Sequence, residues 1–220
     1  HVYKGKDYSD ELTIWHLLSH TSGLPDYFQD KGANGKSLED ELMSGNDQFW
    51  TIEEAIERSK NMSPLFAPGT KGKAKYSDAN FQLLGKIIET ITGKSYAENC
   101  QEHIIQPLGL TKTYLYKDAT DKTPKTMYYK DKEIQTPKAM TSFGADGGMV
   151  SVSADMLIFI EAFFTGKLFR QLISTNCKIG TGFSRRCVQV LVFICSSFLG
   201  FLIPPVQFRT LLDIQDFQVL

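Results

Sequence analysis

The sequence predicts a mixed fold in which helices predominate and a short region forms strands. Three segments carry this prediction. Residues 79–92 place apolar side chains at the spacing of one helix face and end at Gly93, a residue that commonly closes helices. Thr51 and Glu54 form the pattern of a capping box, which marks the start of another helix. Residues 126–134 alternate in character, which predicts short strands or a hairpin.

The first two helices have clear start signals. Residues 13–19 form a short helix capped by Thr13, and its core side chains are expected to be Ile14, Leu17 and Leu18. A turn at residues 22–25 follows, in which glycine supplies conformational freedom and proline blocks further helix. The helix that begins after Thr51 is expected to group three side chains on one face: Ala55, Ile56 and Ser59.

Three more helices are expected further along. The core face of residues 79–92 is predicted to be Leu84, Ile87, Ile88 and Ile91. Residues 96–105 form the next helix, which should end before Pro107 because proline disrupts a helix interior. Ser153 is expected to cap a last helix that ends at Gly166. Its predicted core residues are Leu157, Ile160, Phe163 and Phe164.

Composition excludes some classes of function. The chain has 24 basic and 25 acidic residues, so it has no excess of positive charge with which to bind nucleic acid. The four cysteines, Cys100, Cys177, Cys187 and Cys195, show no zinc-ligand spacing and are interpreted as unpaired. The sequence therefore predicts neither a metal site nor a cofactor.

Two short segments are informative together. Tyr76-Ser77-Asp78 follows the Pro68-Gly69 turn and sets an exposed tyrosine hydroxyl at a loop-to-helix junction, where side chains commonly meet substrate. Earlier in the chain, residues 17–24 read LLSHTSGL. Further segments in the same ordered set are Gly93–Tyr96, Pro107–Leu110, Gly147–Ser151 and Ala154–Met156. This set, over roughly residues 8–168, resembles the serine beta-lactamase-like family of class C beta-lactamases, D-alanyl-D-alanine carboxypeptidases and related esterases.

The resemblance implies an α+β fold of the beta-lactamase/transpeptidase type: an antiparallel sheet flanked by helices, with a mainly helical subdomain. Residues 1–168 would supply part of that domain, mostly the helical part. The implied chemistry is hydrolysis of an amide or ester through an acyl-enzyme, which requires a nucleophile, a base and donors for the oxyanion. In the family the nucleophile is the serine of an S-x-x-K element. No serine of this sequence has a lysine three residues later, so the element is expected upstream of His1.

The resemblance assigns Tyr76 as the catalytic base, whose pKa the family lysine lowers. Asp78 occupies the position of an asparagine in class C beta-lactamases. An ionised aspartate accepts hydrogen bonds but donates none, which favours a peptidase or esterase over a beta-lactamase. Asp78 is expected either to act in the site or to cap a helix beginning at Ala79, and these two roles have equal weight.

Other polar residues near these segments are expected to be structural. His16 and His20 lie four residues apart but lack the glutamate and third ligand of a metal site, so packing is the preferred interpretation. Ser19 and Ser22 are expected to form turn and cap hydrogen bonds rather than to act as nucleophiles. Gly147-Gly148 predicts a tight backbone turn near the site.

Residues 169–220 differ in composition from the rest of the chain. Residues 188–206 are almost entirely apolar, which is compatible with a marginal membrane anchor or a buried strand pair. A third interpretation, a frameshift after about residue 169, is preferred. Codons allowed for residues 211–218, read from their third bases, can encode Ile-Gly-His-Ser-Gly-Leu-Ser-Gly, and family members carry an IGHSG segment as their third active-site element. Residues 169–220 are thus predicted to be a non-native tail.

The sequence leaves three functional alternatives. The first is a serine hydrolase acting on a small-molecule or peptide-like substrate in the periplasm or outside the cell, with this chain itself inactive because it lacks the nucleophile. The second is a non-catalytic fragment or pseudoenzyme that binds a peptide-like ligand. The third is a protein anchored in a membrane through residues 188–206, the only part that predicts membrane association.

Overall fold

The computed structural model describes residues 1–129 and 131–168. Its helices are α1 (Ile14–Leu18), α2 (Leu38–Met43), α3 (Ile52–Lys60), α4 (Asp78–Thr92), α5 (Tyr96–Cys100), α6 (Gln106–Leu108), α7 (Pro137–Met140) and α8 (Ser153–Phe164). Short 3-10 turns lie at Ser9–Glu11 (η1) and Gly144–Asp146 (η3), and a π-helical turn lies at Gln101–Ile105 (η2).

Strands in the described residues form short antiparallel pairs. They are β1 (Val2–Tyr3) with β2 (Lys6–Asp7), β3 (Tyr114–Leu115) with β6 (Met149–Val150), and β4 (Met127–Tyr129) with β5 (Lys132–Ile134). The last pair is the hairpin predicted at residues 126–134, and Met127 is paired with Ile134. The β3–β6 pair joins segments that are far apart in the sequence. Helices and small antiparallel pairs together are consistent with the predicted α+β class.

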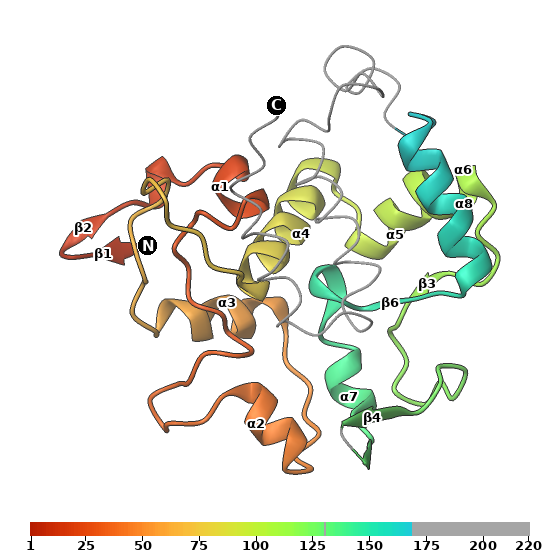
Figure 1. Ribbon diagram of the computed structural model, residues 1–220, viewed down its shortest axis with the longest axis horizontal. Helices are drawn as coiled ribbons and strands as arrows, with labels where there is room; N and C mark the ends of the chain where they lie inside the picture. The colour runs from red at the N-terminus through yellow and green to blue at the C-terminus, as the bar shows by residue number, and fades with distance from the viewer. Residues whose placement is uncertain (130, 169–220) are drawn as a thin grey trace, which may run out of the picture.

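Helix α4 lies at the centre of the molecule (Figure 1) and contacts α1, α3, α5 and η3. It ends where predicted, at Gly93, whose φ is +67° and whose N–H bonds to the Glu89 carbonyl. Burial is concentrated in its first two turns, where Phe81 is inaccessible and Leu84 is 5% exposed. The prediction that Ile91 faces the core is wrong, because that side chain is 76% exposed at the far end of the helix, beyond the buried turns.

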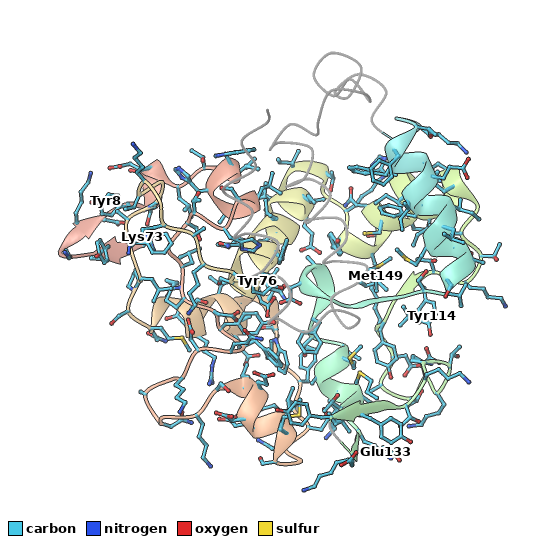
Figure 2. All side chains as sticks on the ribbon, in the orientation of Figure 1. Tyr8, Lys73, Tyr76, Tyr114, Glu133 and Met149 are labelled. Carbon is cyan, nitrogen blue, oxygen red and sulfur yellow. The ribbon has the colours of Figure 1, made fainter. Side chains whose placement is uncertain are left out.

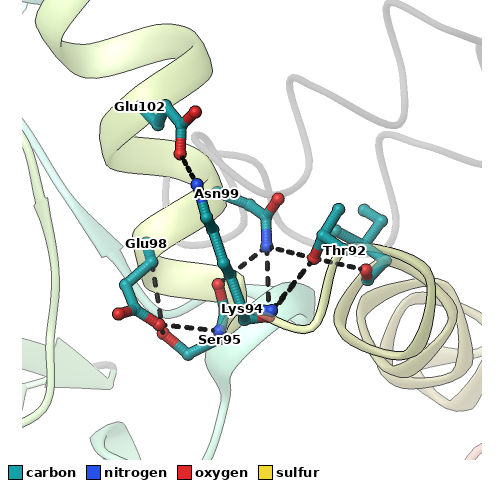
Figure 3. Close-up of polar contacts among 7 residues, drawn as sticks. Thr92, Lys94, Ser95, Glu98, Asn99 and Glu102 are labelled. Atoms are coloured by element: carbon teal, nitrogen blue, oxygen red, sulfur yellow. Dashed lines mark hydrogen bonds and ion pairs between the residues drawn. The ribbon is translucent and has the colours of Figure 1, made fainter.

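Polar contacts hold the end of α4 against α5 (Figure 3). The Asn99 amide donates to the Thr92 hydroxyl and to the Ser95 carbonyl, at 2.9 Å each. Ser95 caps α5 in a reciprocal capping box with Glu98. Lys94 forms an ion pair with Glu102 on the next turn. The junction therefore fixes the angle at which the chain leaves the central helix.

The helix predicted to end before Pro107 continues to Leu108. The π-helical turn explains this, because the Gln106 N–H reaches back five residues to the Gln101 carbonyl. Pro107 lies at the start of α6, directly after the π-helical turn. The helix closes at Gly109, whose φ is +66°.

The capping predictions for Thr13 and Thr51 are confirmed, since each accepts a bond from the third helical residue within a capping box. Other predictions at helix ends and faces are wrong. Val152, not Ser153, occupies the N-cap position of α8. Three side chains expected in the core are exposed: Ile14 (52%), Leu157 (68%) and Phe164 (37%). Helix α8 is apolar nearly all round, so spacing alone does not select its buried face.

Gly23 brings two segments into close contact. Its φ is +73°, and a Cβ at this position would lie 1.9 Å from the Phe66 carbonyl oxygen. The Leu65 N–H bonds to the Gly23 carbonyl at 3.0 Å. Only glycine allows residues 65–66 to approach this turn so closely.

We expect Gly23→Ala to destabilise the chain more than Gly72→Ala. Gly72 has a similar φ of +71° but open space around its Cβ position, so its variant carries only the left-handed strain of about 1–2 kcal/mol. At Gly23 the clash adds about 1–3 kcal/mol. Urea unfolding measures both losses; equal losses would show that the Phe66 carbonyl moves aside freely.

Candidate active site

Tyr76 lies in the loop that enters α4, near the centre of the molecule (Figure 2). Its side chain is partly buried rather than fully exposed, and its hydroxyl donates to Asp78 Oδ1 at 2.5 Å. The preceding residue, Lys75, forms an ion pair with the Asp30 carboxylate at 2.5 Å. The two residues predicted to form the site, Tyr76 and Asp78, are therefore in direct contact.

Asp78 is the first residue of α4 rather than the residue before it. Ser77 occupies the N-cap position, and its side chain forms no capping hydrogen bond. The Asp78 carboxyl instead accepts the hydroxyl of Tyr76 and is 8% exposed. The alternative capping role predicted for Asp78 is thus not the one that the structure shows.

Two further buried carboxyl groups, Asp26 and Asp146, lie close to Asp78. Asp26 Oδ1 accepts from the backbone N–H of Phe28 at 2.8 Å, and its Oδ2 accepts from that of Asp78 at 3.4 Å. Asp146 Oδ2 accepts from the Tyr27 hydroxyl at 2.6 Å. Its Oδ1 is buried without a hydrogen-bond partner among the described residues.

Burial and mutual repulsion raise the pKa values of these carboxyl groups. Burial raises the pKa of Asp26 to about 6. It raises the pKa of Asp78 well above its ordinary value, and the nearby Asp26 and Asp146 carboxyls add to this increase. The pKa of Asp146 is raised for the same reasons. Repulsion between nearby carboxylates favours the protonated form of each carboxyl group.

The raised pKa changes the expectation for hydrogen bonding at position 78. A protonated carboxyl group has one donor O–H as well as acceptor oxygens, as an asparagine side chain has both. The expectation from the sequence was an ionised aspartate, which accepts hydrogen bonds but donates none. Burial and the neighbouring carboxyls shift Asp78 toward its protonated form, so its identity alone does not disfavour a substrate that asparagine would bind.

The same surroundings raise the pKa of the Tyr76 phenol well above 10. Burial is the main cause, and the Asp78 carboxyl adds to it through its charge and its hydrogen bond. The phenol is therefore protonated at neutral pH in this chain. A general base at this position requires a nearby positive charge that outweighs these carboxyls.

The polar residues predicted to be structural form hydrogen bonds with backbone and side-chain groups of the surrounding turns. His16 Nδ1 accepts from the Thr13 N–H in the α1 capping box, and Ser19 donates to the Trp15 carbonyl at 2.6 Å. Ser22 donates to Asn80 Oδ1 at 2.7 Å and accepts from the Leu24 N–H. The tight turn predicted at Gly147-Gly148 is confirmed.

Gly148 packs directly on Gly144, where an added Cβ would meet the backbone nitrogen at 2.8 Å.

Residues that the sequence argument missed surround the predicted pair. Asp26 and Tyr27 directly follow the SGLP turn, and Asp146 directly precedes the paired glycines. Gln82, one turn into α4, donates to Asp146 Oδ2 at 2.9 Å. Their position beside the recognised segments was the available signal, but neither spacing nor composition indicated that they meet.

A cavity of about 290 Å³ lies beside α4. It is lined by residues from α4, α5 and η3 and from the chain before α3, among them Trp50, Gln82, Gly85, Tyr96 and Ala145. Neither Tyr76 nor Asp78 lines it. Gln82 lines the cavity and also donates to Asp146, so this side chain connects the cavity with the buried carboxyl groups.

Within residues 1–129 and 131–168, no three His, Cys, Asp or Glu side chains are arranged to hold a metal ion. None of the helices in these ranges is long and apolar enough to cross a membrane. The apolar residues 188–206, on which the anchor hypothesis rests, lie outside the described residues.

Asp78→Asn should change the pH dependence of stability. The folded-state pKa of Asp78 is raised, so its favourable contribution is complete below its unfolded pKa, 3.8, and is lost as pH rises toward the folded value. Asparagine does not titrate, so the variant should gain stability relative to wild type as pH rises above 4. The gain is limited to about 1.4 kcal/mol per pH unit.

Urea unfolding at pH 4.5, 5.5 and 6.5 measures this difference. The matched control is Asp10→Asn at an exposed position, which should leave the pH slope unchanged. Parallel curves for wild type and Asp78→Asn would contradict the raised pKa.

The described fold is similar to several solved enzymes. A D-stereospecific amidohydrolase from Streptomyces sp. superimposes with a TM-score of 0.63 at 24% identity, over 84% of this chain and 56% of that one. The D-amino acid amidase from Ochrobactrum anthropi SV3 gives a TM-score of 0.57 at 27% identity, over 72% of this chain and 45% of that one. These likenesses confirm the predicted fold type.

Sequence comparison agrees. Teichoic acid D-alanine hydrolase from Staphylococcus aureus is 31% identical over 110 residues, which are 50% of this chain and 23% of that protein. The chain spans 21% to 37% of the length of curated relatives that it matches. The sequence model of the family described as Beta-lactamase matches residues 1–179. The chain therefore belongs to the beta-lactamase family of serine hydrolases and penicillin-binding proteins.

Proposed function

We propose that the 220 residues are part of a serine hydrolase that cleaves an amide or ester through an acyl-enzyme, with Tyr76 as its general base. The observation that carries the proposal is the contact of the Tyr76 hydroxyl with Asp78 at the start of α4, in a chain of this family. In the reaction, the base takes the proton of the serine hydroxyl as its oxygen attacks the carbonyl. The base then returns the proton to the leaving group.

The substrate class proposed is a small D-aminoacyl amide or ester. Two relatives support it by name: one is a D-alanine hydrolase and the other a D-amino acid amidase. Neither name refers to a beta-lactam, and we therefore place peptidase or esterase activity ahead of beta-lactam hydrolysis. The cell-wall relatives also support a site of action in the periplasm or outside the cell.

The nucleophile and its lysine are proposed to come from residues that this sequence does not contain, since no serine in it is followed three residues later by lysine. The lysine would also supply the positive charge that the Tyr76 phenol needs to act as a base. We accordingly propose that the 220-residue chain alone forms no acyl-enzyme.

Covalent labelling with a fluorescent penicillin or fluorophosphonate tests this proposal. The 220-residue chain should remain unlabelled. The extended protein, which adds the residues encoded directly upstream and restores the frame that encodes Ile-Gly-His-Ser-Gly, should be labelled and should hydrolyse D-aminoacyl amides. In the extended protein Tyr76→Phe should lower kcat by about 10²–10⁴-fold, because proton transfer is lost.

Tyr128→Phe is the matched control, because Tyr128 is 66% exposed in the β4–β5 hairpin, and it should leave kcat unchanged. Labelling of the unextended chain would contradict the assignment of the nucleophile. An extended protein with neither labelling nor turnover would favour the non-catalytic alternative.

We propose further that residues 1–168 are the native part of the domain and that residues 169–220 are a frameshifted tail. The tail lies outside the described residues, and the proposal depends on the codon argument for residues 211–218. Resequencing of the DNA after codon 169 tests it. We expect one inserted or deleted base relative to a frame that encodes Ile-Gly-His-Ser-Gly, and reads showing an intact coding frame throughout would refute it.

A further inference from the structure

His20 has an unusual backbone for a buried residue. Its φ of +54° lies in the left-handed region, which is strained for a residue other than glycine. The side chain is 3% exposed, in the turn between α1 and the SGLP segment. Such strain persists only where surrounding contacts hold the residue in place.

Those contacts are made on both sides of Tyr76. The His20 carbonyl accepts the N–H of Lys75 at 2.9 Å. The His20 Nδ1 faces the N–H of Ser77 at 3.4 Å. One residue thus holds the backbone immediately before and immediately after the tyrosine.

The His20 ring also packs on the tyrosine itself. The imidazole and phenol ring centroids are 4.8 Å apart with an interplanar angle of 35°. Phe81 contacts the imidazole edge to face, with the ring centroids 5.1 Å apart, and it also lies against the phenol. The phenol ring therefore rests on a side chain that has no freedom to rotate away.

A second hydrogen bond fixes the orientation of the imidazole. Asn80 Oδ1 accepts from the Ser22 hydroxyl at 2.7 Å, so its amide nitrogen is the group that donates to His20 Nδ1 at 2.9 Å. Nδ1 is then an acceptor for two donors, and the ring proton lies on Nε2. Burial lowers the pKa of His20 to about 4, which keeps the ring neutral and Nδ1 open as an acceptor at neutral pH.

We propose that His20 is the positioning residue of Tyr76. It sets the place of the phenol through its carbonyl, its Nδ1 and the face of its ring. This role rests on the proposed function of Tyr76 as the base, but the geometry it predicts is measurable in the 220-residue chain without any activity. A packing histidine would fill the same space without a required tautomer or a required acceptor.

The first experiment uses the wild-type chain. The ¹⁵N spectrum of the imidazole at pH 7 should show an unprotonated Nδ1 and a protonated Nε2, and the Ser77 amide should be protected from hydrogen exchange. The reverse tautomer, or an unprotected Ser77 amide, would overturn the proposal. Failure of the labelling experiment above would leave this result untouched, so the two proposals fail separately.

Two variants then separate the ring from the acceptor. His20→Asn keeps an oxygen at the Nδ1 position and tolerates the left-handed backbone, but it removes the ring. His20→Phe keeps a ring and removes the acceptor. Ser77 protection should survive in the first and be lost in the second, while the Tyr76 ring signal, assigned with Tyr76→Phe, should shift in both.

In the extended protein both variants should lower kcat by about tenfold to a hundredfold with little change in KM, because the base is misplaced rather than removed. His103→Asn is the matched control at an exposed position of η2, and it should change neither signal nor rate. Unchanged Tyr76 signals and unchanged kcat in both His20 variants would reduce His20 to a packing residue.

Discussion

The contact between residues 20–27 and the first turn of α4 is the interaction on which the candidate site depends. Ser77 donates to the Pro25 carbonyl at 3.0 Å, and Ser22 donates to Asn80. Asp26 accepts from the first N–H of the helix. These polar groups are buried, so each would cost about 1–3 kcal/mol if it lost its partner. The turn and the helix can therefore only form together, and the loop between them has little choice of path.

The interior beside Tyr76 is strongly acidic. Three carboxyl groups in a buried space destabilise one another, and a protein without a use for them would be more stable with apolar residues there. Perturbed carboxyls of this kind concentrate at functional sites, where charge is held ready for a partner. The cluster is thus better explained by the chemistry of the site than by the stability of the described residues.

The sequence predicted the parts of the structure that depend on local chemistry. Capping boxes at Thr13 and Thr51, the end of α4 at Gly93 and the β4–β5 hairpin all depend on neighbours within a few residues. The buried faces of α1 and α8 were predicted poorly, because burial depends on which distant elements pack against a helix. A helix that is apolar all round carries no periodic signal that selects its face.

The candidate site shows the same contrast between local features, which the sequence predicts, and long-range contacts, which it does not. An ordered set of short segments predicts Tyr76 and Asp78 as site residues. It does not predict that Asp26, Asp146 and Gln82 lie beside them, since these contacts span more than fifty residues. The shift in the pKa of Asp78 could not be predicted from the sequence either. An isolated aspartate is an anion at neutral pH, whereas burial and the neighbouring carboxyls raise the pKa of Asp78 in the folded chain.

The raised pKa of Tyr76 bears on the proposed reaction, in which this residue acts as a base. Burial and the Asp78 carboxyl both raise that pKa, so the described residues alone stabilise a protonated phenol, which is the wrong state for a base. A buried ammonium group would reverse this, and it would also stabilise the ionised forms of Asp78 and its neighbours, since one positive charge acts on all of them at once. In the proposed enzyme, the lysine expected beside Tyr76 would therefore lower the pKa of the phenol and the pKa values of the neighbouring carboxyl groups together.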